Sequence, residues 1–545
     1  MAAMPTGRMM AFPLTLTHLW ERARTYFPKQ EIVSRLPDRS VHRQTYADFA
    51  TRTAKLAAAL HRLGVRPGDR VATLCWNHRQ HLEAYYAVPM MGAVVHTLNL
   101  RLHPTELAFI ARDAEDTVVI VDRSLWKLFE SFGPQVPSIR AVIVVPDSGP
   151  APDGTHDYEA LLAAEEGTYA WPALDENEAA MLCYTSGTTG NPKGVLYSHR
   201  STVLHALSSC LVDSLGIRES DVCLPVVPMF HASAWGVPFA AVLAGAKLVM
   251  PGPHLDAVSL LDLMHQERVT LAAGVPTIWL GILAALDAEP KRWDLASVRS
   301  MVIGGAAAPA SMIEGFATRH GLEVTHAWGM TETNPLGTVA RVKHTLRDAG
   351  PAAHLEARAS QGCAVPFVET RHVDDDGRVL PWDGSTYGEL EVRGPWVAQS
   401  YYGGVGADRF TADGWFKTGD VVTLDAEGYV RITDRSKDVI KSGGEWISSV
   451  ALENALMSHP AVLEAAVFGG RHAKWDERPI AAVVFKEGRT ASDDELRAHL
   501  VSRFAKFWLP DAFVVVTQIP RTSTGKFLKS KLRETYGGML EGREG

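Results

Sequence analysis

Residues 184–194 read YTSGTTGNPKG. This stretch contains three glycines, four Ser or Thr hydroxyls, Pro192 and Lys193. Glycines allow the backbone to approach an anion closely, and backbone N–H groups, hydroxyls and an ammonium can all donate to phosphate oxygens. We therefore expect a phosphate-binding loop here, with a solvated Gly/Ser/Thr turn as the competing interpretation.

The position of this loop favours phosphate binding. Residues 179–184 are apolar and strand-like, so the loop follows the end of a buried strand, where α/β sheets bind ligands. Lys193 is followed by Gly194 instead of Ser or Thr, and Pro192 removes a backbone donor. The stretch thus differs from the Walker loop of common NTPases and predicts another class of phosphate site.

On both sides of the loop, strands and helices alternate, which predicts an α/β fold with doubly wound parallel sheets. One helix should begin where Thr45 and Asp48 form a cap-like pair. From Glu369 onward, short β segments with Asp-Gly and Glu-Gly turns predict a small barrel-like sheet. The expected helices are 16–27, 45–64, 78–91, 104–113, 125–132, 202–215, 257–267, 277–286, 450–458 and 493–504. The expected strands are 69–75, 93–96, 117–121, 141–145, 179–184, 222–228, 247–250, 271–275, 300–303, 323–327, 465–469, 480–485 and 513–517.

Composition narrows the class of protein. The chain has 545 residues, of which 46% are apolar and 21% charged, as in ordinary globular enzymes. A formal net charge of −8 argues against a nucleic-acid partner held by a basic surface. The five cysteines lack CxxC or metal-site spacing, which predicts reduced thiols and a cytoplasmic protein. No apolar run approaches the roughly 20 residues of a membrane span, so no integral membrane association is expected.

Six motifs follow one another along the chain, and together they resemble those of a known family. In order they are YTSGTTGNPKG, WGMTET (328–333), KTGD (417–420), DRSKD (434–438), SGGEWIS (442–448) and PRTSTGK (520–526). This order resembles the adenylate-forming superfamily of acyl-CoA synthetases, firefly-type luciferases and peptide-synthetase adenylation domains. The resemblance covers essentially the whole chain. PMFHASAW (228–235) and KSGGEWISS (441–449) are most similar to bacterial fatty-acyl-CoA synthetases.

The resemblance implies a two-step reaction. A carboxylate attacks the α-phosphate of ATP, giving an acyl-adenylate and pyrophosphate, and the thiol of coenzyme A then displaces AMP to form a thioester. The implied small molecules are ATP, Mg²⁺, coenzyme A and a carboxylic acid. The resemblance also implies three parts: an AMP- and acyl-binding domain at 1–433, a hinge at 434–439, and a small mobile α+β domain at 440–545. A homodimer is expected by likeness alone.

For the nucleotide, the resemblance implies a catalytic set of Lys526, Thr331 and Glu332. Thr331 would donate to the α-phosphate, and Glu332 would hold Mg²⁺, a hard cation that prefers oxygen ligands. Asp420 would accept from the ribose hydroxyls with Arg435 as its partner. Taken singly, such residues are more often a solvated acid, a turn aspartate or an exposed lysine. The implied ATP- and AMP-binding residues are Thr185, Ser186, Gly187, Thr188, Thr189, Gly190, Lys193, Gly305, Ala306, Ala307, Trp328, Gly329, Met330, Thr331, Asp420, Arg435 and Lys526.

The other substrates are assigned by the same resemblance. The acyl-binding residues would be His231, Trp235, Gly305 and Trp328. The coenzyme A residues would be Lys441, Gly443, Gly444, Glu445 and Trp446, with Lys437 at the hinge. Many relatives have Tyr where this chain has Trp328, and the larger indole could shorten the acyl pocket.

The substrate therefore stays open. It is either a medium- to long-chain fatty acid or a short functionalised acid such as 3-(methylthio)propionate. The rival functions are adenylation that loads a carrier-protein thiol, and a non-catalytic nucleotide- or fatty-acid-binding protein. Because a binding protein has no use for a lysine at position 526 on a moving domain, the ligase is favoured.

Overall fold

The computed structural model describes residues 7–185, 191–435, 438–442, 445–501, 503–522 and 527–541. The helices are α1 (Leu16–Tyr26), α2 (Tyr46–Arg62), α3 (Arg79–Met90), α4 (Pro104–Asp113), α5 (Trp126–Phe132), α6 (Tyr158–Ala163), α7 (His199–Cys210), α8 (Ala232–Trp235), α9 (Val237–Ala244), α10 (Ala257–Gln266), α11 (Pro276–Ala288), α12 (Ala310–His320), α13 (Pro351–Ala359), α14 (Ser449–Met457), α15 (Asp493–Val501) and α16 (Lys529–Tyr536).

The strands of the two large sheets are β1 (Glu31–Arg35), β2 (Val41–Thr45), β3 (Arg70–Leu74), β4 (Val94–Thr97), β5 (Asp116–Asp122), β6 (Ala141–Val145), β7 (His156–Asp157), β8 (Ala179–Tyr184), β9 (Gly194–Ser198), β10 (Val222–Pro225), β11 (Lys247–Met250), β12 (Leu271–Gly274), β13 (Ser300–Ile303), β14 (Val324–Gly329), β15 (Leu336–Val339) and β16 (Cys363–Ala364). The remaining strands are β17 (Glu369–Val373), β18 (Gly388–Arg393), β19 (Phe416–Leu424), β20 (Val430–Arg435), β21 (Ile440–Ser442), β22 (Glu445–Ile447), β23 (Val462–His472), β24 (Asp476–Phe485) and β25 (Ala512–Val515).

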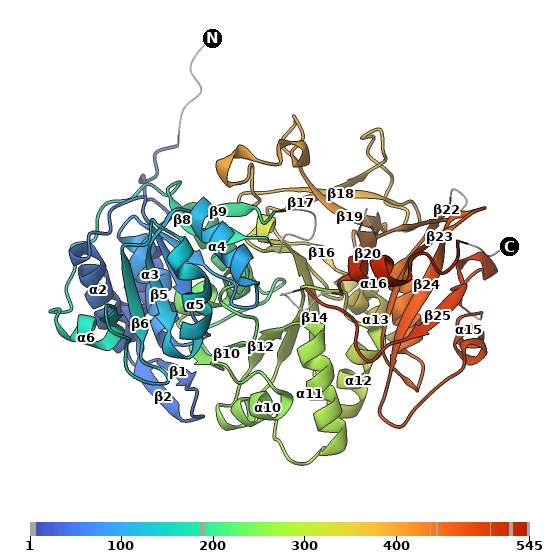
Figure 1. The fold of residues 1–545 in the computed structure, drawn as a ribbon, viewed down its shortest axis with the longest axis horizontal. Coiled ribbons are helices and arrows are strands. Elements are labelled where there is room, and N and C mark those ends of the chain that lie inside the picture. Colours follow the sequence, from blue (N-terminus) through green and yellow to red (C-terminus); the bar gives the residue numbers. More distant parts are fainter. Residues whose placement is uncertain are drawn as a thin grey trace, which may run out of the picture.

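Two mainly parallel sheets form the body of the molecule (Figure 1). The first sheet has the order β7-β6-β5-β3-β4-β8-β9, and β9 is antiparallel at its edge. The second has the order β16-β15-β14-β13-β12-β10-β11-β1-β2 and is parallel from β14 to β1. The expected doubly wound α/β architecture is confirmed.

Helices of both sheets share one hydrophobic core, because α1, α3, α7 and α9 pack against one another. Within it, the rings of Tyr85 on α3 and Phe239 on α9 stack with centroids 5.5 Å apart. Burying aromatic and aliphatic side chains of this size stabilises the fold by about 1.5–3 kcal/mol each. The two sheets therefore behave as one packed support for the loops at their strand ends.

Local signals explain most element boundaries. At α2, Thr45 Oγ1 accepts from Asp48 N and the Asp48 carboxylate accepts from Thr45 N, which is the predicted capping pair. The helix expected at 202–215 is α7, which spans His199–Cys210. It begins earlier because the Ser198 hydroxyl caps it by accepting from Ser201 N, and Leu211 already has extended backbone.

Two smaller sheets follow in the chain and lie toward the C-terminal side in Figure 1. Strands β17, β18, β19 and β20 pair antiparallel in chain order, as expected for a small β sheet in this region. The last sheet has the order β22-β21-β24-β23, with β25 parallel to β24, and it packs with α14, α15 and α16. In the described ranges, every helix is too short or too polar to cross a membrane.

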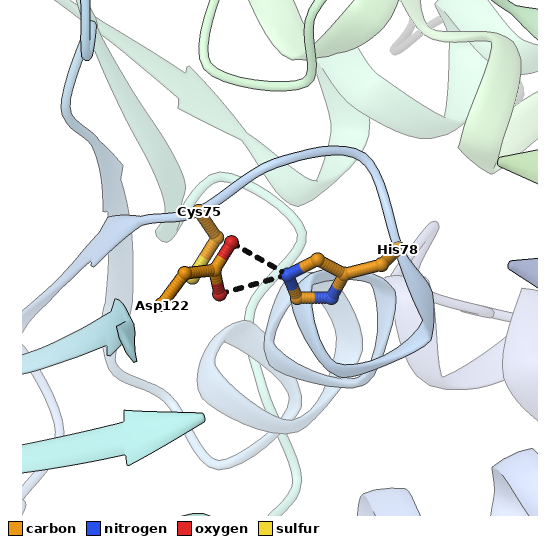
Figure 2. A group of neighbouring side chains, drawn as sticks. All are labelled: Cys75, His78 and Asp122. Carbon is orange, nitrogen blue, oxygen red and sulfur yellow. Dashed lines mark hydrogen bonds and ion pairs between the residues drawn. The ribbon is translucent and has the colours of Figure 1, made fainter. Parts of the chain in front are cut away.

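Cys75, His78 and Asp122 meet at the carboxyl ends of β3 and β5 (Figure 2). His78 Nε2 lies 2.8 and 2.9 Å from the two carboxylate oxygens of Asp122, and its Nδ1 accepts from His81 N at the start of α3. Trp76 N donates to the same carboxylate at 2.8 Å. Burial raises the pKa of the Cys75 thiol, which keeps it neutral. The polar atoms of His78 and Asp122 thus bond to each other and to the backbone, and they join the ends of β3 and β5 to the start of α3. We infer a structural role for this cluster.

Each of the chain's five cysteines lies within the described ranges and is a free thiol, as predicted.

Candidate active site

A cavity of about 460 Å³ lies at the carboxyl ends of β12, β13 and β14, where Val275, Gly304 and Gly329 contribute to its wall. Ligands of α/β proteins bind at this end of the sheet. The predicted site residues that line the cavity are Thr185, Lys193, His231, Trp235, Gly305, Ala306, Ala307, Trp328, Gly329, Met330, Thr331, Glu332, Asp420 and Arg435.

Some predicted residues are elsewhere. Lys441 is an exposed residue of β21, outside the cavity lining, and its backbone pairs with that of Trp446 on β22. Residues predicted from the motifs that lie outside the described residues are Ser186, Gly187, Thr188, Thr189, Gly190, Lys437, Gly443, Gly444 and Lys526.

The ends of the predicted phosphate loop are held together. Thr185 N donates to Lys193 O at 2.9 Å, and Lys193 N donates to Thr185 Oγ1 at 3.1 Å. Lys193 Nζ lies 4.9 Å from the centroid of the Tyr401 ring, within cation–π range. The loop connects the antiparallel strands β8 and β9, so it spans a hairpin and not a strand-to-helix turn.

Thr331 and Glu332 form a short turn directly after β14, and a tyrosine hydroxyl holds each of them. Tyr197 donates to Thr331 O at 2.7 Å, and Tyr401 donates to Glu332 Oε1 at 2.6 Å. Burial, together with the Glu332 carboxylate, raises the pKa of Tyr401 well above its usual value, so the phenol stays a donor. Glu332 is only 6% exposed although it lines the cavity. One such carboxylate, completed by phosphate oxygens, suits Mg²⁺.

Asp420 is fixed by two donors from different parts of the chain. Arg435 pairs with it across β19 and β20, and its Nε lies 2.6 Å from Asp420 Oδ1. Trp328 Nε1 donates to Asp420 Oδ2 at 3.0 Å. The carboxylate is 1% exposed overall but lines the cavity. Its orientation leaves acceptor capacity for a vicinal diol such as ribose.

The apolar side of the cavity depends on an unusual backbone. Ala232 to Trp235 all have φ between 41° and 56°, the left-handed region that side chains other than glycine rarely adopt. This turn lays the Trp235 indole against two glycines: a Cβ on Gly304 would lie 3.2 Å from Trp235 Cη2 and 3.0 Å from Ala327 O. Apolar neighbours on this side are Leu215, Val275, Pro276, Leu280 and Val302.

The Trp328 indole lies beside Asp420, to which it donates a hydrogen bond, and it packs on Gly337, where a Cβ would lie 2.5 Å from Trp328 Cζ3. The suggestion that this residue shortens the acyl pocket stays a prediction.

Residues of the C-terminal part of the chain, after β21, contribute to the cavity wall. Residues of α14 line it, and so do Thr522 and Phe527. These two flank 523–526, and a β-bridge between Arg521 and Phe527 joins the two ends of that segment. The described residues on either side of 523–526 therefore lie at the cavity wall.

Sequence reasoning missed several lining residues. Tyr401 and Arg409 belong to no motif, Ile432 is an ordinary position of β20, and Gln361 lies in the loop just before β16. A signal existed for Tyr197, because strand alternation after the phosphate loop places Val195 and Tyr197 inward and Leu196 outward.

Comparisons with known proteins agree with this geometry. A family model described as AMP-binding enzyme matches residues 19–402, and one described as AMP-binding enzyme C-terminal domain matches residues 451–526. A long-chain-fatty-acid–CoA ligase of Thermus thermophilus is 49% identical, with 97% of this chain and 98% of that protein covered. A 3-methylmercaptopropionyl-CoA ligase of Ruegeria pomeroyi is 46% identical, with 98% and 100% covered. The crystal structure of an anthranilate CoA ligase in complex with anthranoyl-AMP aligns with a TM-score of 0.86 at 26% identity, covering 97% of this chain and 98% of that one.

Proposed function

This chain belongs to the family of AMP-binding enzymes, and we propose that it is an ATP-dependent, AMP-forming fatty-acid–CoA ligase that works through an acyl-adenylate. One observation carries the proposal. A single cavity is lined by the Asp420–Arg435 pair, the Thr331–Glu332 turn and Lys193, and also by apolar residues that include Trp235. Such a cavity can hold a nucleotide and an acyl group side by side.

In the proposed first step, the residues of this chain position two anions and limit the charge that develops between them. Asp420, with Arg435, binds the ribose, and Lys193 with the phosphate loop binds the β- and γ-phosphates. Thr331 donates to the α-phosphate, and Lys526 reaches the attacking carboxylate and the same phosphate. Bound to Glu332, Mg²⁺ would neutralise phosphate charge.

In the proposed second step, coenzyme A replaces the lysine segment next to the acyl-adenylate. Residues 434–439 act as the hinge between 1–433 and 440–545. This stretch includes the end of β20 at Arg435 and ends just before β21 begins at Ile440, which supports this division. The pantetheine path runs past 441–446. Free thiols and the use of ATP and coenzyme A support a cytoplasmic enzyme. A homodimer remains part of the proposal by likeness.

We propose a medium- to long-chain fatty acid as the substrate, because the acyl side of the cavity is apolar and the Thermus relative is named for long-chain acids. The Ruegeria relative favours one alternative, a short thioether acid such as 3-(methylthio)propionate.

The test is pyrophosphate release with ATP and Mg²⁺ across straight-chain acids from propionate to palmitate and 3-(methylthio)propionate, each with and without coenzyme A. Coenzyme A-dependent turnover that peaks at one chain length supports the ligase and identifies its acid. A maximum with the thioether acid supports the alternative. No turnover with any acid, despite ATP binding, contradicts both.

A further inference from the structure

A second cavity, of about 150 Å³, shares no lining residue with the candidate active site. It lies where strand ends of the two large sheets meet: Gly252, which follows β11 of one sheet, donates from its N to Asn77 O, which follows β3 of the other, at 3.0 Å. We call this cavity the strand-end pocket, and its wall includes Arg35, Trp76, His78, Arg79, Val145 and Gly252.

The strand-end pocket has a position at which α/β folds bind ligands. In the first sheet, β3 lies between β4 and β5 and pairs parallel with both. The chain therefore goes from β3 to one neighbour and then across to the other, which makes the carboxyl end of β3 a topological switch point. His78, which Figure 2 shows bonded to Asp122 at this end, lines the pocket. The candidate active site uses strand ends of the other sheet, so this switch point is left for a second ligand.

Arg35, the last residue of β1, is the side chain that points to an anion. It is 7% exposed, and its Nη1 donates to Ser259 O at 2.6 Å. Its Nε has no hydrogen-bond partner, and among the described residues its guanidinium forms no ion pair. Burial lowers the pKa of Arg35, the direction expected of a cation without a close counter-charge. Because buried charges in proteins are normally paired, a bound anion would compensate this guanidinium.

The acidic side chains of the pocket wall are engaged by other donors. Glu159 Oε1 lies 3.0 Å from Arg79 Nη2. Asp147 accepts from Ser124 N at 2.8 Å and also from the Ser124 hydroxyl. Arg35 therefore brings a positive charge that these two carboxylates do not neutralise.

The start of α3 adds to the attraction for an anion. Arg79 is the first residue of this twelve-residue helix, and Arg79 N donates to Ser34 Oγ at 3.0 Å, which holds the helix start beside the end of β1. The N-terminal end of a helix carries partial positive charge, and its N–H groups favour a negatively charged ligand. Two independent features, a buried guanidinium and a helix start, thus meet at one pocket.

We propose that the strand-end pocket binds a small organic carboxylate, with the carboxylate at Arg35 and the start of α3 and the hydrocarbon part against Trp76 and Val145. One uncompensated cation suits a monoanion, and the apolar neighbours suit a hydrocarbon group. A cavity of about 150 Å³ holds a molecule of about the size of benzene, which limits the acid to a short chain or a single ring. The proposal is independent of the proposed function, because it uses none of the residues assigned there.

The test is a titration of 4,4,4-trifluorobutyrate into the full-length protein without ATP, followed by fluorine NMR. Because the proposed function also gives the active site an affinity for acids, variants of the pocket identify the component that belongs to it. Arg35→Met removes the cation and should raise the Kd of that component by about tenfold or more. Replacement of an unpaired buried charge by an apolar side chain of similar length should preserve the fold.

Two further variants complete the experiment. His42→Trp changes a half-buried residue of the pocket wall on the edge strand β2, and the larger ring should block the pocket while Arg35 is kept. Arg39→Met is the matched control, because Arg39 Nη1 donates to Ser259 Oγ at 3.1 Å but Arg39 lies outside the pocket lining. The control should bind the acid as the normal protein does.

A binding component that is lost in Arg35→Met and His42→Trp and kept in Arg39→Met would support the proposal. Equal binding by all four proteins would overturn it. Inorganic phosphate is the second probe: if it displaced the fluorinated acid at lower concentrations than butyrate does, and only where Arg35 is present, the pocket would be a phosphate site and the carboxylate assignment would be wrong. Since no turnover is required, failure of the proposed function would leave the Arg35-dependent component unchanged.

Discussion

Trp328 donates a hydrogen bond of 3.0 Å from Nε1 to Asp420 Oδ2, while Arg435 Nε lies 2.6 Å from the other oxygen of the same carboxylate. A residue that was expected to frame the adenine therefore also orients the residue expected to bind the ribose. One hydrogen bond thus links the two predicted nucleotide contacts in this chain.

Replacing Trp328 with Phe tests that coupling. The ring is largely retained but the donor to Asp420 is lost, and a hydrogen bond to a charged group contributes about 1.5–3 kcal/mol. We expect the KM for ATP to rise about tenfold or more, with a smaller change in the KM for the acid. Trp293→Phe is the control, because Trp293 Nε1 donates to Asp262 Oδ1 at 2.7 Å outside the cavity lining. An unchanged KM for ATP in the Trp328 variant would contradict the coupling.

Replacing Tyr401 with Phe tests the proposed metal ligand. The variant removes the hydroxyl that donates to Glu332 Oε1, and loss of such an outer partner typically weakens metal binding by about 10-fold or more. The Mg²⁺ concentration for half-maximal velocity should rise by that factor. Tyr402→Phe, at a neighbouring residue outside the cavity lining, should leave it unchanged. A lower velocity with an unaltered Mg²⁺ requirement would argue that Tyr401 supports only the fold.

Replacing Trp235 with Ala should lengthen the acyl pocket, because the indole covers Gly304 and Gly305. The ratio of kcat/KM for longer acids to that for shorter acids should rise by about tenfold, the usual scale for apolar pockets. The measurement is a chain-length series at fixed ATP. Gly304→Ala is the opposing change, since its new methyl would press on the indole and on Ala327 O, and it should lower activity with every acid. An identical chain-length profile in Trp235→Ala would exclude Trp235 from the acyl wall.

Lys526→Ala should abolish acid-dependent pyrophosphate exchange and leave thioester formation from a synthetic acyl-adenylate largely intact. The reason is that the proposed role of this ammonium, neutralising charge between two anions, exists only in the first step. Lys531→Ala, an exposed lysine on α16, is the control. Equal loss of both half-reactions would contradict the assignment.

The pH dependence of the free energy of unfolding should reveal the titration of the Glu453 carboxyl. Burial, partly opposed by Lys529, raises the pKa of Glu453 from 4.5 to about 7. The folded state then binds a proton that the unfolded state has released, so this residue's contribution to stability is complete below pH 4.5 and is lost as the pH rises to about 7 and above. Such a shift corresponds to about 3 kcal/mol.

In Glu453→Gln this titration is absent, so the denaturation midpoint of the normal protein should fall relative to that of the variant between pH 4.5 and 7. Glu487→Gln, at an exposed acid, should run parallel to the normal protein. A constant difference between normal protein and Glu453→Gln across this range would contradict the raised pKa.

Much of the secondary structure followed from local patterns. The predicted bounds of α4, β6, β11 and β13 agree with the structure, since apolar periodicity, caps and turn residues act within a few positions. The paired strands β1 and β2 were not predicted. β1 lies between β2 and β11, and its register partner for Ile32 is Leu248, so its strand character depends on a neighbour far along the chain.

The candidate site was likewise predicted only in part: the sequence indicated its residues but not their contacts. The order of the motifs identified Thr331, Glu332 and Asp420 as candidates, because six motifs in one order indicate a family, although each residue taken singly more often has an ordinary role. Nothing near Tyr401 in the sequence indicates that its hydroxyl reaches Glu332, 69 positions away. Likewise, nothing near Lys529 in the sequence indicates that its ammonium lies 3.9 Å from Asp434 Oδ1.

The amino-acid sequence alone thus established the alternation of elements, the family and the set of reactive side chains, because these depend on residue type and short-range spacing. The folded chain alone established which of those side chains meet. Trp328 reaches Asp420 across 92 positions because two separate sheets, which contain β14 and β19, pack so that these two side chains meet. That packing minimises exposed apolar surface over the whole molecule, a free energy that no local segment contains.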